Sequence, residues 1–181
     1  KFDNNTGALL REESSKLQAQ KVQGLVIDLR NNPGGYLDQA IEVTSEYLKE
    51  GIAVIEKREK DNKTKEYKVS GKGSFTDTNL PIVVLINEGS ASAAEIVAGA
   101  LDDYDRATLI GEKTFGKGSV QSIETLSGGN TLHITVAHWY TPKGRSIDGD
   151  GLNPDIVVTP TETDIANNND VQLTKALIYL K

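Results

Sequence analysis

The sequence predicts an α/β fold in which a mixed, largely parallel sheet is flanked by helices. Short apolar runs rich in branched residues occur at 24–29 and 81–86, and each is followed by a tight turn and a helical pattern. A third run at 108–111 completes two strand–turn–helix crossovers. Topology rules make such crossovers right-handed and the strands that they join parallel.

In the first part of the chain, the spacing of apolar residues and the turn-forming residues predict a helix, a strand and a second helix. Leucines spaced among Glu, Lys and Gln predict an amphipathic helix within 2–22. The strand at 24–29 ends at 30–35, where one proline, two asparagines and two glycines predict a turn with a positive φ angle. Helical spacing over 37–48 then ends at Gly51.

The middle and last parts of the chain predict further elements. Residues 57–79 hold seven Lys or Arg in 23 residues and are expected to form an exposed insertion, with a hairpin at the edge of the fold. An alanine-rich helix follows the strand at 81–86. The remaining elements expected are a hairpin formed by 119–126 and 131–140, a short strand at 155–158 and a closing helix at 171–180.

Length and composition limit the function classes. The 181 residues, 37% hydrophobic and 25% charged, suit one globular domain. A net charge of −6 disfavours binding to nucleic acid or to an anionic membrane surface. The absence of cysteine excludes a thiol nucleophile and a thiolate metal site. No apolar stretch approaches the roughly 18 residues of a membrane span, and the absence of Met leads us to expect any signal or anchor upstream.

Ser92 is the candidate nucleophile because it lies where a buried strand turns into a helix. The N–H groups of a first helical turn point at whatever binds there. The amide of Ala93, which follows the serine, could form half of an oxyanion hole, and Gly34 or Gly35 after the neighbouring strand could supply the second donor. The alternative is that Ser90 or Ser92 is simply a helix N-cap.

Lys117 is the candidate general base because it stands between two glycines at the start of a strand. A lysine base must be neutral, which requires burial or a nearby cation to lower its pKa from about 10.4. Gln121, four residues later, is expected on the same face of an extended strand and could hold the lysine amine toward Ser92. The alternative is an exposed loop lysine.

Four sequence blocks together resemble the carboxyl-terminal processing (tail-specific) serine proteases. The blocks are 25–35, 87–96, 111–118 with Gln121, and 149–155. The resemblance implies a crotonase/ClpP-like core in which Ser92 is the nucleophile, Lys117 the general base and Gln121 the residue that orients the lysine. It also implies an oxyanion hole formed by Gly34 or Gly35 with Ala93, and a reaction that needs neither cofactor nor metal.

The same resemblance implies a wider protein around this domain. Family members carry an upstream PDZ domain and an export or anchor segment, and neither is visible in 1–181, which therefore resembles a single serine protease core. The implied substrates are the C-terminal regions of proteins outside the cytoplasm. Membrane association and self-association of the full-length form are also implied, and the activity of the core alone is an open question.

Parts of the sequence also suggest three other functions. Residues 111–118 approach a phosphate-binding loop, but Gly118 follows the lysine where Ser or Thr is needed, and a strand follows where a helix is needed. A Ser-His-Asp triad could use His133 or His138, which lie five residues apart and so on opposite faces of one strand. A catalytically silent or ligand-binding module on the same core is the remaining alternative.

Overall fold

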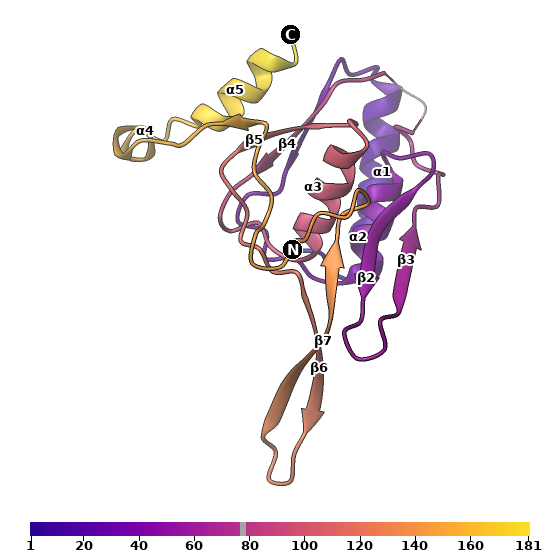
Figure 1. The fold of residues 1–181 in the computed structure, drawn as a ribbon. Helices are drawn as coiled ribbons and strands as arrows, with labels where there is room; N and C mark the ends of the chain where they lie inside the picture. The colour runs from indigo at the N-terminus through magenta and orange to yellow at the C-terminus, as the bar shows by residue number, and fades with distance from the viewer. Residues whose placement is uncertain (77–78) are drawn as a thin grey trace.

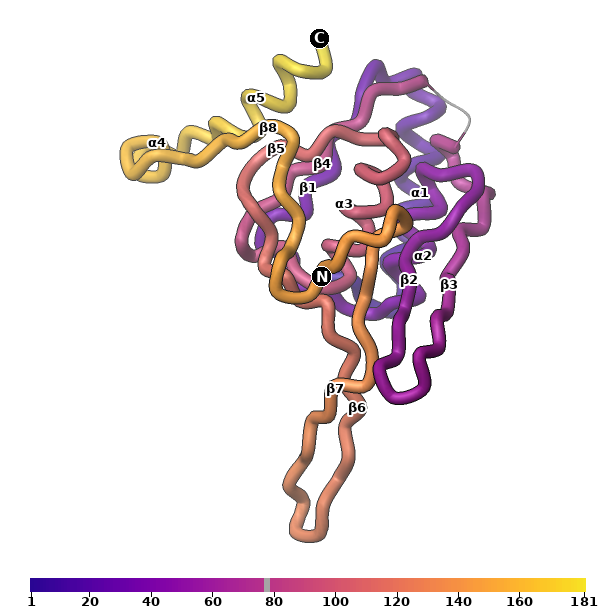
Figure 2. Tube along the Cα trace, in the orientation of Figure 1, coloured from indigo at the N-terminus to yellow at the C-terminus, as the bar shows by residue number. Residues whose placement is uncertain are grey.

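The computed structural model describes residues 1–76 and 79–181, which form two four-stranded sheets and their helices (Figures 1 and 2). The helices are α1 Thr6–Ala19, α2 Leu37–Ser45, α3 Ala93–Asp103, α4 Glu162–Ala166 and α5 Val171–Tyr179. The strands are β1 Leu25–Asp28, β2 Ile52–Lys57, β3 Thr64–Lys68, β4 Ile82–Ile86, β5 Thr108–Gly111, β6 Ser119–Thr125, β7 Thr131–Tyr140 and β8 Ile156–Val157.

One sheet is parallel throughout, with strand order β1-β4-β5-β8. Its central strand β4 is completely buried because it is covered on both faces. Ile82, Val84 and Ile86 face the main core with α2 and α3, whereas Val83 and Leu85 face a second cluster with α5. Double coverage explains the continuous apolar run in place of an alternating one.

The other sheet is antiparallel, with strand order β3-β2-β7-β6. The α/β class is confirmed, whereas the parallel and antiparallel strands lie in two separate four-stranded sheets and not in the one mixed, largely parallel sheet that the sequence predicts. Helix α3 contacts β5 of the first sheet and β2 of the second. Leu101 of α3 therefore shares one buried cluster with Leu109 and Val54 from the two sheets.

The β6–β7 hairpin extends away from the body of the molecule in both views (Figures 1 and 2). Exposed apolar side chains gather on it, and they are Ile123, Leu126, Leu132, Ile134 and Val136. At the base of the hairpin, Trp139 is buried against the edge of Tyr67 from β3. The hairpin is thus fixed at its base by an aromatic contact between strands.

The segment 57–79 combines exposed and buried parts, and its residues 77–78 lie outside the described residues. Residues 57–66 at the β2–β3 turn are exposed. In contrast, Phe75 is buried and stacks on Tyr47. The segment therefore contributes β3 to the second sheet and an aromatic side chain to the main core.

The C-terminal region includes one element that the sequence patterns did not indicate, the five-residue helix α4. Thr161 and Asp164 form its capping box. None of the helices in the described ranges is long and apolar enough to cross a membrane.

Candidate active site

Two turns at the carboxyl ends of β1 and β4 are joined by hydrogen bonds. The backbone N–H of Asn31 donates to Oδ1 of Asn87 at 2.8 Å, and Nδ2 of Asn87 donates to Oδ1 of Asn31 at 3.1 Å. The N–H of Ala91 donates to the carbonyl of Asn32 at 2.9 Å. Neighbouring parallel strands end at the same sheet edge, so the turn 30–35 and the turn 87–92 become one rigid unit.

Ser92 occupies a strained position at the end of this unit. Its φ of 56° and ψ of −117° are rare for a residue with a side chain, and it is the N-cap residue of α3. Ser90 has a different role, because it is fully buried and its hydroxyl donates to the carbonyl of Leu29 at 2.7 Å. Of the two serines, Ser92 is the partly exposed one, on a sharp strand-to-helix turn that suits a nucleophile.

Gly34 lies directly against Ser92. A Cβ atom added at Gly34 would lie 2.7 Å from Cβ of Ser92 and 2.9 Å from the backbone nitrogen of Ala93. The close approach and the φ of 93° both require glycine. The structure therefore brings together Ser92, Ala93 and the predicted glycine pair.

The two glycines differ in what their N–H groups do. The N–H of Gly34 donates to Oδ1 of Asn32 at 3.1 Å. Gly35 forms a parallel bridge with Phe2, but its own N–H does not bond to Phe2. The two hydrogen bonds of the bridge join Phe2 to the carbonyl of Gly34 and to the N–H of Tyr36. Among the residues that the structure describes, neither the N–H of Gly35 nor that of Ala93 has a hydrogen-bond acceptor.

Glu95 links the serine turn to the lysine loop, and sequence reasoning did not single it out. Its fully buried carboxylate accepts the N–H of Ser92 at 2.8 Å and the N–H of Lys117 at 2.9 Å on the same oxygen, Oε2. Oε1 accepts the hydroxyl of Thr114 at 2.5 Å and the N–H of Gly116 at 2.7 Å. Glutamate three residues after an N-cap serine is the sequence signal that could have identified it.

Lys117 and Gln121 are both exposed. Lys117 lies in the loop before β6, and the described residues of this chain leave its side chain exposed. They therefore do not provide the burial that would lower the pKa of a lysine base. Gln121 pairs with Thr135, and the register of β6 shifts between Val120 and Gln121. This shift interrupts the strand alternation on which the same-face argument for Lys117 and Gln121 relied. Their roles stay predictions.

The alternative chemistries find little support at this site. Both ring nitrogens of His138 face carboxylates, those of Glu59 and Asp148, and His133 is exposed. Strand β6 follows Gly118, where a phosphate-binding loop would continue as a helix. Within residues 1–76 and 79–181, no three His, Asp or Glu side chains lie close enough together to hold a metal ion.

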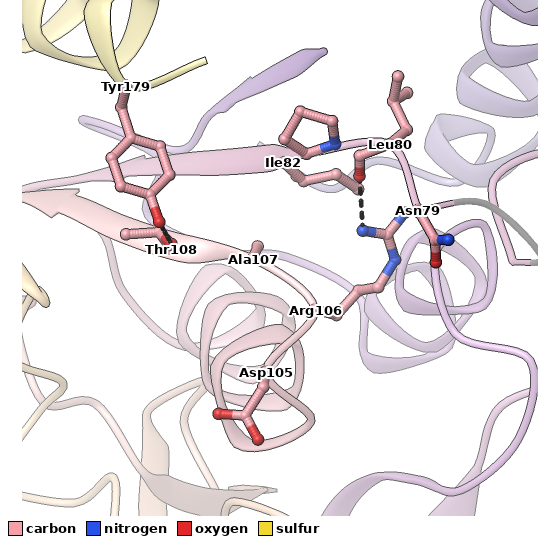
Figure 3. A pocket seen from close by; sticks show the side chains of 9 residues that line it. Asn79, Leu80, Ile82, Asp105, Arg106, Ala107, Thr108 and Tyr179 are labelled. Atoms are coloured by element: carbon pink, nitrogen blue, oxygen red, sulfur yellow. Dashed lines mark hydrogen bonds between the residues drawn. The ribbon is translucent and has the colours of Figure 1, made fainter. Parts of the chain in front are cut away.

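A cavity of about 370 Å³ lies at the opposite edge of the parallel sheet (Figure 3). Ile82 and Thr108, at the amino ends of β4 and β5, line it together with Arg106 and Tyr179. The Arg106 guanidinium donates to the carbonyl of Leu80 at 2.9 Å. Because the serine turn follows the carboxyl end of β4, this cavity is separate from the site.

Comparison with known proteins gives matches to proteases over most of the chain. The family model for peptidase family S41 matches residues 1–158. A carboxy-terminal-processing protease of Bartonella bacilliformis is 51% identical over 83% of this chain and 34% of its own length. A protein of Staphylococcus epidermidis named as a CtpA-like serine protease is 38% identical over 88% of this chain and 32% of its own length.

Solved structures agree with the sequence matches. The photosystem II D1 C-terminal processing protease has a TM-score of 0.81 and 36% identity over 94% of this chain and 44% of that chain. The tricorn protease, at 21% identity and a TM-score of 0.63 over 87% of this chain and 15% of that chain, shares the fold.

The fold and the matches place this chain among α/β domains of the protease class, and its relatives include a protein named as a serine protease. The chain belongs to peptidase family S41, the family in which the carboxy-terminal-processing proteases are found. It spans about a third of the length of the curated relatives that it matches.

Proposed function

We propose that this chain is the catalytic core of a serine endopeptidase that uses Ser92 as nucleophile and Lys117 as general base, with Gln121 orienting the lysine. The observation that carries the proposal is the shared carboxylate oxygen of Glu95, which accepts the N–H groups of both Ser92 and Lys117. Two backbone N–H groups that donate to the same oxygen atom must lie close together, so Ser92 and Lys117 are neighbours in space. The nucleophile and the base thus start from adjacent points of the backbone.

The proposed reaction is acyl transfer in two steps. Neutral Lys117 takes the hydroxyl proton as Oγ of Ser92 attacks the peptide carbonyl carbon, and the resulting lysine ammonium then protonates the leaving amine. An acyl-enzyme ester remains on Ser92. Lys117 next removes a proton from water, whose oxygen attacks the ester carbon, and returns that proton to Oγ of Ser92 as the acid product leaves.

The oxyanion would be held by the N–H groups of Gly35 and Ala93. Both groups lack acceptors within the described residues, whereas the N–H of Gly34 already donates to Asn32. The carbonyl of Gly34 and the N–H of Tyr36 bond to Phe2, so the N–H of Gly35 between them faces away from Phe2. Two preorganised amide donors at a developing negative charge are the usual way to stabilise an acyl-transfer transition state.

Because Lys117 is exposed, its amine must be shielded from water by another group before its pKa falls far enough for it to act as a base. We propose that bound substrate removes water from the lysine amine, since the removal of water disfavours the charged form. The chain spans about a third of its relatives' length, so other parts of a longer protein are also candidates. From the family resemblance of the sequence blocks, we propose substrates cleaved near their C-termini outside the cytoplasm, an upstream PDZ domain, membrane association and self-association.

The test is cleavage of an unfolded protein by Ser92→Ala, Lys117→Ala and Gln121→Ala variants, with and without any upstream domain. We expect the first two to lose at least about a thousandfold in kcat/KM, since nucleophile and base act as one unit. Gln121→Ala should lose less, because it acts through the lysine. Ser122→Ala and Lys113→Ala are matched controls from the same region and should keep full activity.

The outcomes separate the candidate functions. Retained cleavage in Ser92→Ala or Lys117→Ala would reject the dyad. Absence of cleavage by the unsubstituted protein in both forms would instead favour a silent or ligand-binding module.

A further inference from the structure

The loop that carries Lys117 is held on two sides. On one side, the N–H groups of Gly116 and Lys117 donate to Glu95. On the other side, the N–H of Gly118 donates to Oδ1 of Asp148 at 3.2 Å. A Cβ atom at Gly118 would lie 2.2 Å from the backbone nitrogen of Asp148, so the two backbones are in direct contact.

Asp148 in turn faces His138 from β7. Nδ1 of His138 lies 3.1 Å from Oδ2 of Asp148, while Oδ1 of the same carboxylate holds Gly118. The His138 side chain is 21% exposed and that of Asp148 is 36% exposed. One carboxylate therefore connects a histidine of the second sheet to the residue next to Lys117.

The opposite side of the imidazole faces a more exposed group. Nε2 of His138 lies 3.1 Å from Oε1 of Glu59, whose side chain is 77% exposed. In the sheet, His138 pairs with Lys57 of β2 and Ser119 of β6. The two ring nitrogens therefore face two carboxylates, and the amine of Lys57 lies 4.0 Å from the centre of the Tyr140 ring.

Imidazole chemistry allows the Asp148 contact in both the neutral and the charged form of the ring. A neutral imidazole has one N–H and can donate to one of the two carboxylates, whereas the imidazolium donates to both. The tautomer with its proton on Nδ1 keeps the bond to Asp148 and leaves Nε2 without a proton toward Glu59. Either form of the ring can thus donate from Nδ1 to the carboxylate that holds Gly118.

We propose that His138 and Asp148 are positioning residues for Lys117. The His138 ring fixes the orientation of the Asp148 carboxylate, the carboxylate fixes the N–H of Gly118, and this bond sets where the lysine side chain leaves the backbone. Neither side chain touches the reacting atoms. The proposal rests on the proposed function only in so far as Lys117 is the base, since the contacts themselves are independent of catalysis.

The first measurement does not need activity. Amide hydrogen exchange at Gly118, resolved by nuclear magnetic resonance, is compared between the unsubstituted protein and the Asp148→Ala and Asp148→Asn variants. We expect exchange to quicken at least about tenfold in Asp148→Ala, because the N–H loses its acceptor. Asp148→Asn retains an acceptor oxygen, so it should restore most of the protection.

The second measurement is kinetic and uses the form of the protein that cleaves the unfolded substrate. We expect Asp148→Ala to lower kcat about tenfold with KM changed less than about twofold, as misplacement of a base affects the chemical step more than binding. His138→Ala should lower kcat in the same direction, and His138→Gln should recover part of it by donating to Asp148. His133→Gln, at an exposed position of the same strand, is the matched control and should leave kcat unchanged.

The two measurements distinguish failure of the positioning role from failure of the proposed function. Unchanged Gly118 exchange in Asp148→Ala, or unchanged kcat in a protein whose Lys117→Ala variant is inactive, would overturn the positioning role. If Lys117→Ala or Ser92→Ala still cleaves, the proposed function fails. The exchange rate then decides alone whether Asp148 fixes the loop.

Discussion

At the scale of single residues, Glu95 and Gly34 determine where the serine stands. Glu95 is a buried carboxylate that accepts hydrogen bonds from two segments, the serine turn and the lysine loop. The donors are Ser92 on the turn and Thr114, Gly116 and Lys117 on the loop. A buried carboxylate with several charge-assisted hydrogen bonds is strongly held. Gly34 allows the close approach of the two turns, because any side chain at this position would collide with Ser92.

Gly34→Ala tests this close packing. We expect a loss in the free energy of unfolding larger than the roughly 1–3 kcal/mol that a strained positive φ costs by itself. Cleavage should fall about a hundredfold as Ser92 is displaced. Urea unfolding and initial rates measure the two effects.

Gly128→Ala is the matched control for backbone strain. Gly128 has a φ of 95°, against 93° at Gly34, and no atom lies within 4 Å of an added Cβ. It should therefore show the strain without the collision, and cleavage should be unchanged. Equal effects of the two substitutions would contradict the packing argument.

At the scale of elements, an arginine at the end of β1 fastens α5 to the parallel sheet. The Arg30 guanidinium donates through two nitrogens to Asp28 and through two to Asp170, with distances of 2.7–2.9 Å. Asp170 is also the N-cap of α5, accepting the N–H of Leu173 at 2.9 Å. The hydrogen bonds from Arg30 hold the pKa of Asp170 below its ordinary value.

Asp170→Ala tests how this contact depends on pH. A carboxyl group whose pKa is lowered by folding stabilises the protein above its unfolded pKa of about 3.9, and the effect is lost as pH falls through the lower folded value. At neutral pH we expect a loss of about 1–2 kcal/mol in the free energy of unfolding, mostly from the cap, since the partly exposed ion pair is screened.

The measurement is urea unfolding between pH 7 and pH 3. The Asp170→Ala protein should lose less stability over the acid part of this range than the unsubstituted protein. Asp150→Ala, at an exposed loop position, is the control and should follow the unsubstituted curve. An acid loss of equal size in both proteins would exclude Asp170 as a source.

At the scale of the whole molecule, helix α3 joins the two sheets and begins directly after its N-cap residue Ser92. The core cluster contains Leu101 from α3, Leu109 from the parallel sheet and Val54 from the antiparallel sheet. Because the sheets share one core, we expect them to unfold together. Fluorescence of Trp139, which is in the antiparallel sheet, and circular dichroism should give coincident transitions.

Leu101→Ala tests this shared core. Truncation of a fully buried leucine should lower the free energy of unfolding by about 2–5 kcal/mol through lost transfer energy and the cavity left behind. Leu177→Ala, on the exposed side of α5, should change it by less than about 1 kcal/mol. Two separated transitions in the Leu101→Ala protein would show that the sheets are independent units.

Sequence patterns located most elements because their causes are local. The apolar run before Asn87 and the alanine-rich helix after it became β4 and α3. The same patterns could not show that β2 pairs with β7, since this pairing joins residues far apart in the chain. They also could not show the register shift beside Gln121, which depends on how the hairpin fits the rest of the sheet.

The sequence by itself determined the fold class, the family resemblance and the candidate residues Ser92, Lys117 and Gln121. Tertiary structure decided that Glu95 bonds both the serine turn and the lysine loop and that Asp148 holds Gly118. It also decided that the N–H of Gly35 has no acceptor among the residues that the structure describes. The physical reason is the separation along the chain of the residues that interact. Propensities and turn chemistry act between near neighbours, whereas a buried carboxylate acquires its donors only when packing brings distant segments around it.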